Sequence, residues 1–317
     1  MPAVPGRRGS LKTAEGRIRT GFIAAPSQIE PVAFILSVTS AMATPSCPVC
    51  AAPSIVEDRL TEVTLCRCHA CDHCFTDLAS VQHFESYDER YYEQTHRNWF
   101  LHPDVGLFEK LRVIISRYKP SASVLDLGCG NGNFLKYLRH ADNRLSLTGV
   151  DTCPNDPAPG ITFVQGDLFE TRFDHQFDVV ASLAVIEHVP DVVKFAHRLH
   201  GLCAPNGLVI TMTVDERSLI YRTARGLRHV GFSLPTVRLY DKHHLNHFNH
   251  SSLKRLLEQE GLATVQQLRH DPPMNAVDMP PVSALMGSIL RAGVRVAFGV
   301  GDLVGAPMNQ TIVSRKL

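Results

Sequence analysis

The sequence VLDLGCGNGNF, at residues 124–134, constrains the fold more than any other part of the chain. Its first four residues have the apolar pattern of a buried strand, and helical spacing of apolar residues begins at Phe134. Glycines at positions 128, 130 and 132 lie between the two. Glycine lets backbone N–H groups approach a ligand closely and adopts positive φ at little steric cost. The segment therefore predicts a ligand-binding turn that connects a strand to a helix.

Acidic residues at three predicted strand ends indicate which ligand this turn holds. A dinucleotide site has the spacing G-x-G-x-x-G, whereas this turn reads G-x-G-x-G and has Asn133 in place of the third glycine. Asp126 would repel a pyrophosphate but suits a ligand that carries an ammonium and a sulfonium group. Asp151 follows the next predicted strand at the spacing of an acid that binds ribose hydroxyls. Asp167 follows the strand after that, where it can accept a bond from an adenine amine.

In this order and spacing, the motifs resemble those of the class I S-adenosylmethionine-dependent methyltransferases. The likeness is to the branch of quinone-biosynthesis O-methyltransferases and of natural-product and polysaccharide methyltransferases. It covers about residues 107–263 and returns near Thr311. The matching pieces are VLDLGCGNGNF, LTGVD at 147–151, VQGDLF at 164–169, FDVVASLAVIEHVPD at 177–191 and CAPNGLVITMT at 203–213.

The resemblance implies an α/β fold: a seven-stranded Rossmann-like methyltransferase sheet with helices on both faces. It places S-adenosylmethionine across the carboxyl ends of the strands. The implied cofactor-binding residues are Asp126, Gly128, Cys129, Gly130, Gly132, Asp151, Thr152, Asp167 and Leu168.

Glu187 and His188 are the predicted catalytic residues, because the resemblance places the chemistry after the fourth strand. Methyl transfer to a hydroxyl needs a base, and imidazole has an ordinary pKa near working pH. The quinone-type enzymes present Glu-x-x-Glu-His here and are thought to place a divalent ion on it, but this chain has Ala184 at the first acidic position. This departure disfavours quinone precursors as substrates. A His188 that only bonds to backbone at a helix entry is the alternative, and His244 or His247 is then a second candidate base.

Two C-x2-C pairs, separated by 17 residues, precede the methyltransferase-like region. Their spacing is that of a four-thiolate zinc site formed by Cys47, Cys50, Cys68 and Cys71. A module as short as residues 45–80 builds little core, so a structural metal would supply its folding free energy. Cys66 and Cys74 complicate the assignment, but the missing terminal Cys-Pro disfavours an iron–sulfur cluster. Reduced cysteines without a metal are the alternative.

The sequence predicts four parts. Residues 1–41 lack periodicity and are expected to be a disordered extension or an over-extended start, with Met42 as the working initiator. The other parts are a zinc-ribbon-like module at 45–80, an aromatic linker or lid at 81–105, and a methyltransferase domain at 106–317 with an acceptor-side insertion at about 216–250. Arginines of this insertion, Arg222, Arg225, Arg228 and Arg238 among them, can hold a phosphate or carboxylate, although a solvated face is the safer expectation.

Composition fits a cytoplasmic globular enzyme. Lys+Arg 32 against Asp+Glu 31 leaves no basic excess, and the ribbon segment has two basic residues against five acidic ones. Nucleic acid is therefore not expected as a partner. The apolar stretch 280–304 contains Arg291 and Arg295 and is too interrupted to be a transmembrane segment. It can pack on the core, form a homodimer face or touch lipid.

We therefore expect methyl transfer from S-adenosylmethionine to an oxygen of a small molecule or saccharide, with a structural zinc ion in the ribbon. One alternative is an RNA base methyltransferase, because some ribosomal-RNA guanine methyltransferases carry a similar zinc knuckle. The other is a non-catalytic binding protein that retains the cofactor fold.

Overall fold

The structure is a computed structural model that describes residues 45–81, 97–279 and 282–317. The predicted extension at 1–41 lies outside the described residues, as does most of the aromatic linker, including Tyr87, Tyr91 and Tyr92.

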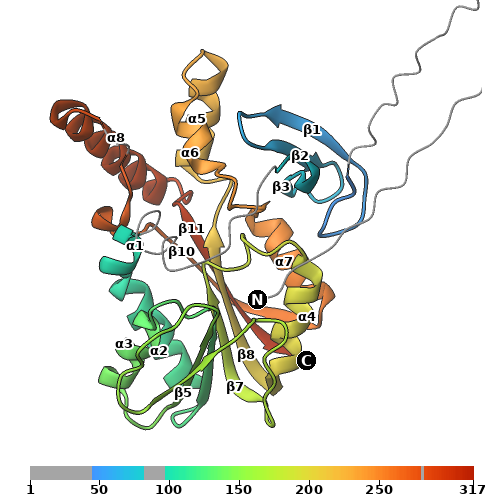
Figure 1. The fold of residues 1–317 in the computed structure, drawn as a ribbon, viewed down its shortest axis with the longest axis vertical. Helices are drawn as coiled ribbons and strands as arrows, with labels where there is room; N and C mark the ends of the chain where they lie inside the picture. The colour runs from blue at the N-terminus through green and yellow to red at the C-terminus, as the bar shows by residue number, and fades with distance from the viewer. Residues whose placement is uncertain (1–44, 82–96, 280–281) are drawn as a thin grey trace, which may run out of the picture. The chain divides into compact units, whose positions relative to one another are not determined.

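A seven-stranded mixed sheet forms the centre of the chain, as predicted (Figure 1). Its order is β10-β11-β8-β7-β4-β5-β6. Neighbours from β8 to β6 pair in parallel, and β11 pairs antiparallel with both β8 and β10. The bounds are β4 (Ser123–Leu127), β5 (Ser146–Asp151), β6 (Ile161–Gln165), β7 (Phe177–Leu183), β8 (Cys203–Val214), β10 (Leu262–His270) and β11 (Asn309–Lys316).

Helices cover both faces of this sheet because its central strands are apolar on both sides. In β4, Val124 packs with α2 (Val105–Tyr118) and α3 (Asn133–Ala141), whereas its neighbour Leu125 packs with α4 (Val192–Leu202) and α7 (His250–Gln259). This alternation continues in β7 and β8 and produces two separate clusters of buried side chains. Figure 1 shows the two helical layers on opposite sides of the strands.

A second, four-stranded antiparallel sheet belongs to the cysteine-rich module. Its first strands, β1 (Ser54–Arg59) and β2 (Thr64–Cys68), form the hairpin between the cysteine pairs, and β3 (Cys74–Thr76) follows. The fourth strand is β9 (Asn246–His247), which comes from the insertion after β8. The module and the insertion therefore share one sheet, and nothing in the sequence pattern indicated this pairing.

Within the described residues, four further α-helices lie outside the two layers. α1 (Arg97–Leu101) ends the aromatic linker, and α5 (Leu219–His229) and α6 (Leu234–Leu239) belong to the insertion. α8 (Ala284–Leu303) connects β10 to β11 through the short helix η3 (Met274–Ala276); a second short helix, η1 (Leu78–Ser80), follows β3.

The apolar stretch near the C-terminus forms one continuous helix, α8. That it is not a transmembrane segment stays a prediction. Neither the glycines nor the two arginines break α8 over its 20 residues. By length and composition alone it is apolar enough to cross a membrane, with a mean hydropathy of 1.3 over its most apolar window. Only 11% of that window is buried, which distinguishes α8 from the core helix of a soluble protein.

Candidate functional site

The glycine turn lies between β4 and α3, as predicted. Its three glycines have φ values of 83°, 53° and 74°, a region that other residues rarely adopt. A Cβ atom at Gly128 would lie 2.5 Å from Val185 Cγ2, and one at Gly130 would lie 2.7 Å from Phe100 Cε1. The turn therefore requires glycine both for its backbone conformation and for the close approach of two other segments.

Asp126 and Asp151 lie beside this turn, at adjacent ends of β4 and β5. Asp151 accepts bonds from the N–H groups of Gly130 (2.8 Å) and Cys153 (3.0 Å). Asp126 is buried, and Oδ1 of its carboxyl has no hydrogen-bond partner among the described residues. Burial, with a smaller contribution from the charge of Asp151, raises the pKa of Asp126 to about 7. A buried carboxyl without a partner fits the ammonium group of an S-adenosylmethionine molecule.

The other predicted cofactor residues lie farther along the same edge. Asp167 follows β6 and is exposed, and its Oδ1 caps the next turn by accepting from the N–H groups of Phe169 (2.7 Å) and Glu170 (3.1 Å). The backbone oxygens of Thr152 and Leu168 accept from Gln165 Nε2 and Arg198 Nε, both at 3.1 Å. The Cys129 side chain is buried beneath the turn.

The loop after β7 carries Glu187 and His188. Its Ala184 has a φ of 57°, and the His188 N–H bonds to the Val185 carbonyl at 2.9 Å. Because Val185 also packs against Gly128, this loop lies directly on the glycine turn.

His188 has a fixed tautomer. Its Nδ1 lies 2.9 Å from the His243 carbonyl oxygen, which can only accept, so Nδ1 carries the proton and Nε2 is the basic nitrogen. The His188 ring also meets the His244 ring edge-on, with 4.8 Å between centroids. His247 is different, because it is fully buried and burial lowers its pKa to about 3.

Glu187 connects the loop to the insertion through its backbone. Its carbonyl oxygen accepts from the N–H groups of Leu245 (2.7 Å) and Asn246 (3.0 Å). Its carboxyl is buried near Thr213, and burial raises its pKa to about 7. With Ala184 at the first acidic position and this carboxyl in the interior, the residues present do not fit the divalent ion of the quinone-type enzymes.

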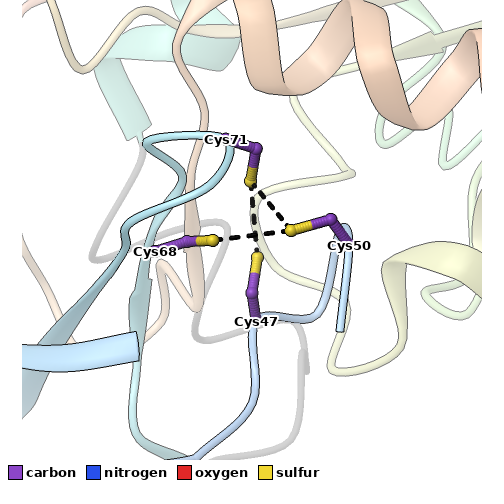
Figure 2. A group of neighbouring side chains, drawn as sticks. All are labelled: Cys47, Cys50, Cys68 and Cys71. Carbon is purple, nitrogen blue, oxygen red and sulfur yellow. Dashed lines mark hydrogen bonds between the residues drawn. The ribbon is translucent and has the colours of Figure 1, made fainter. Parts of the chain in front are cut away.

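The four predicted zinc ligands converge on one point, as Figure 2 shows. Their sulfur atoms all lie within 4.8 Å of one another, and three of the separations are 3.4 to 3.5 Å. These distances are too long for a disulfide but close to the edge of a tetrahedron with Zn–S bonds of about 2.3 Å. The residue after each pair, Ala51 or Asp72, has a positive φ, so both knuckles make the same turn. The site thus fits a zinc ion.

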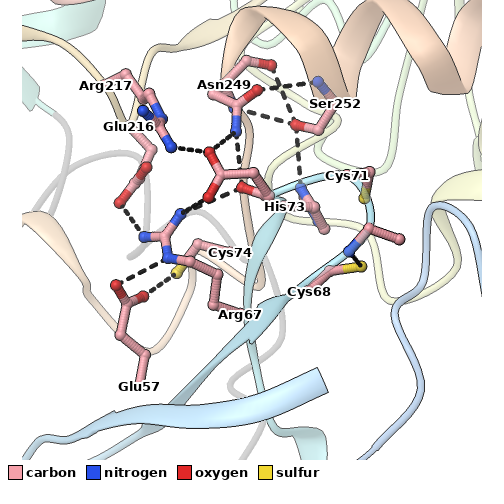
Figure 3. A network of polar contacts seen from close by, with 12 residues as sticks. Glu57, Arg67, Cys68, Cys71, His73, Cys74, Glu216, Arg217, Asn249 and Ser252 are labelled. Atoms are coloured by element: carbon pink, nitrogen blue, oxygen red, sulfur yellow. Dashed lines mark hydrogen bonds and ion pairs between the residues drawn. The ribbon is translucent and has the colours of Figure 1, made fainter. Parts of the chain in front are cut away.

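Cys66 and Cys74 are not members of this group. Cys74 belongs to a second group with Glu57 and Glu216, but the Arg67 guanidinium lies between the two carboxylates. It donates to Glu57 at 2.8 Å and to Glu216 at 2.7 Å (Figure 3). A cation is therefore already paired with both acids.

Charge pairs hold the ribbon on the insertion. The acids of the ribbon, Asp58 and Asp72, pair with Arg228 and Arg217. Arg225 pairs with the buried Glu216 and donates to the Tyr240 hydroxyl at 2.7 Å. Arg225 and Arg228 are therefore structural, whereas the sequence allowed an acceptor contact and favoured a solvated face. These pairs use two of the five acids of the ribbon.

Phe100 is a site residue that the pattern of the glycine turn alone did not reveal. Its ring lies against Gly130, and its carbonyl oxygen accepts from Asn133 Nδ2 at 2.8 Å. The described end of the aromatic linker at 81–105 therefore contacts the predicted cofactor turn.

Comparisons with known proteins agree with this geometry. A family model described as a methyltransferase domain matches residues 92–267. The ubiquinone biosynthesis O-methyltransferase of Rickettsia felis is 26% identical over 154 residues, which are 42% of this chain and 62% of that protein. The corresponding protein of Azorhizobium caulinodans is 33% identical over 109 residues, 29% of this chain and 40% of that protein. The malonyl-[acyl-carrier protein] O-methyltransferase of Calditerrivibrio nitroreducens is 28% identical over 119 residues, with coverages of 37% and 47%. The chain thus spans less than two thirds of each of these relatives.

Among solved structures, similarity extends to a chain of the Haloferax volcanii complex between a methyltransferase activator and a methyltransferase. The TM-score is 0.52 at 15% identity, over 73% of this chain and 99% of that one. At this identity the likeness concerns the fold alone. The family model for a methyltransferase domain matches more than half of this chain, so the chain belongs to that family. Its fold is that of class I S-adenosylmethionine-dependent methyltransferases.

Proposed function

We propose that this protein transfers the methyl group of S-adenosylmethionine to an oxygen atom of a small-molecule or saccharide acceptor. The observation that carries the proposal is the tautomer of His188. Because its Nδ1 donates a hydrogen bond to a carbonyl oxygen, Nε2 is the base, and the loop that carries His188 contacts the glycine turn. Such a base is needed where a hydroxyl loses its proton as the methyl group arrives. The curated relatives, named as O-methyltransferases, support oxygen as the acceptor atom.

The glycine turn and the two acids beside it would hold the cofactor. Asp126 suits its ammonium group, and Asp151 suits the ribose hydroxyls while it keeps the turn in shape. When bound, S-adenosylmethionine supplies an electrophilic methyl group on its sulfonium. His188 then accepts the acceptor's proton at Nε2, and Glu187 positions the loop through its backbone bonds to the insertion.

A direct test is methyl transfer from radiolabelled S-adenosylmethionine to fractions of a small-molecule extract. We expect label in a product whose methyl group is bound to oxygen, as identified by NMR. Label in nitrogen-bound or RNA products, or no turnover with any fraction, would contradict the proposal.

Asp151→Ala should weaken S-adenosylmethionine binding by about 1–3 kcal/mol, because ligand hydroxyls lose a charged acceptor. Isothermal titration calorimetry measures this. Asp174→Ala removes an acid with a fully solvated side chain and serves as the control, with unchanged affinity. Equal affinities for the two variants and the parent protein, all folded, would show that Asp151 does not bind the cofactor.

A further inference from the structure

α8 exposes an apolar stripe along its entire length. The residues of this stripe are spaced by three, four or seven positions, so they share one helix face: Leu285, Ile289, Val296, Val300 and Leu303. Leu285 is 74% exposed and Leu303 is 87% exposed. The opposite face is also apolar and packs on the protein through Phe298 and Gly301. A surface helix that needed only to be soluble would place polar residues on the exposed side.

The turn between α5 and α6 presents a second exposed apolar group. Leu227, Val230, Phe232 and Leu234 are exposed there, and α5 contacts α8. In Figure 1, the α5–α6 pair and α8 extend beyond the same end of the central sheet. Two segments far apart in the sequence therefore expose apolar side chains beyond this end of the sheet, and we call the two together the α5–α8 surface.

Arginines outnumber acids on the α5–α8 surface, where Asp302 in the last turn of α8 is the one acid of residues 217–240 and 284–303. Residues 217–240 contain five arginines and no acidic residue, and residues 279–301 contain Arg291 and Arg295 and no acidic residue. Arg217, Arg225 and Arg228 are paired with acids of the ribbon or insertion, whereas the exposed Arg222, Arg238 and Arg295 have no carboxylate partner among the described residues. The surface thus combines exposed apolar side chains with unbalanced cations, which complements a negatively charged lipid surface.

We propose that the α5–α8 surface binds an anionic lipid bilayer, with α8 lying in the plane of the interface. Crossing the bilayer does not fit, because one face of α8 packs on the protein and two arginines lie near its centre. A second copy fits less well. In a symmetric dimer that buried the full stripe, the two α8 helices would run antiparallel, and the two Arg295 residues would lie within about 4.5 Å of each other along the helix axis. Such like charges repel, whereas anionic headgroups attract them.

The test is flotation of the full chain with vesicles of phosphatidylcholine alone or mixed with phosphatidylglycerol. We expect binding to the anionic vesicles that is at least about tenfold tighter than to neutral ones and that weakens with salt. The double variant Ile289→Glu/Val296→Glu should lose binding by a similar factor or more. Ile55→Glu/Val265→Glu is the matched control, because these two side chains are similarly exposed elsewhere and should leave binding unchanged.

The charge contribution has its own variant. Arg222→Gln/Arg295→Gln should reduce binding to anionic vesicles and leave binding to neutral vesicles unchanged. This variant keeps the apolar stripe of α8, so it remains a test even if the two glutamates of the other variant disturb the helix. Absence of flotation, or equal flotation of the control and the Ile289→Glu/Val296→Glu variant, would overturn the proposal. The proposal would also be overturned if light scattering showed a dimer that Ile289→Glu/Val296→Glu converts to a monomer, and if the protein bound no vesicles. The surface would then be a subunit interface.

Discussion

Replacing His188 with alanine should lower the turnover number by roughly 10²–10⁴-fold, the usual contribution of a positioned base. S-adenosylmethionine affinity should change little, because His188 is held by its Nδ1 bond to the His243 carbonyl and is assigned to the proton of the acceptor. Single-turnover rates with a saturating acceptor, together with calorimetry of cofactor binding, measure the two effects separately. Retention of parental turnover would mean that the site acts by alignment alone.

Two controls separate His188 from its neighbours. In the parent protein, the rate should rise with pH through the range in which imidazole loses its proton. Burial raises the pKa of Glu187 to about 7, so this carboxyl titrates in the same range. If the rate still rises with pH in His188→Ala but no longer does so in Glu187→Gln, the base is Glu187 and not His188. His244→Ala tests the ring that contacts His188.

Local features of the sequence predicted the cofactor side of the fold. The strand, glycines and helix at 124–141 depend on contacts between near neighbours, so a pattern of a few residues specifies them. The four zinc ligands were predictable for a similar reason, since each knuckle is a four-residue turn.

The acceptor side was not predictable in the same way. β9 has two residues and pairs with β3, about 170 positions away, and so short a strand has no detectable periodicity. The roles of Arg225 and Arg228 depend on partners that only this pairing brings near. His247, a second candidate base from the sequence, is a buried partner of Cys74 in the same sheet.

These long-range contacts connect the ribbon to the predicted base. β3 pairs with β9, and Thr76 N–H bonds to the Leu245 carbonyl at 2.9 Å. The N–H of the same Leu245 bonds to Glu187, and His243, two residues earlier, fixes the His188 tautomer. We infer that the ribbon is a support for the acceptor side of the site, not an independent binding module.

Removing one zinc ligand, as in Cys71→Ala, should therefore impair more than the ribbon. We expect the zinc content to fall from one ion per chain to almost none and residues 45–80 to lose their order, because zinc contributes about 10–16 kcal/mol to folding in comparable zinc-finger peptides. Without β3, the segment at 243–247 loses its sheet partner. Turnover should then fall, while S-adenosylmethionine affinity stays near the parental value, since β4 and β5 belong to the other sheet and the glycine turn is held by bonds to β5.

The matched control is Cys66→Ala, which removes a buried cysteine of the same module that is not in the ligand group. It should keep its zinc. Metal analysis, hydrogen exchange at 45–80 and 243–247, and calorimetry distinguish the possible outcomes. Equal zinc loss in both variants would place the wrong cysteines in the site. If zinc is lost, hydrogen exchange increases only at 45–80 and turnover stays intact, the ribbon does not support catalysis. The bonds from 243–246 to Glu187 and His188 would then hold without the ribbon.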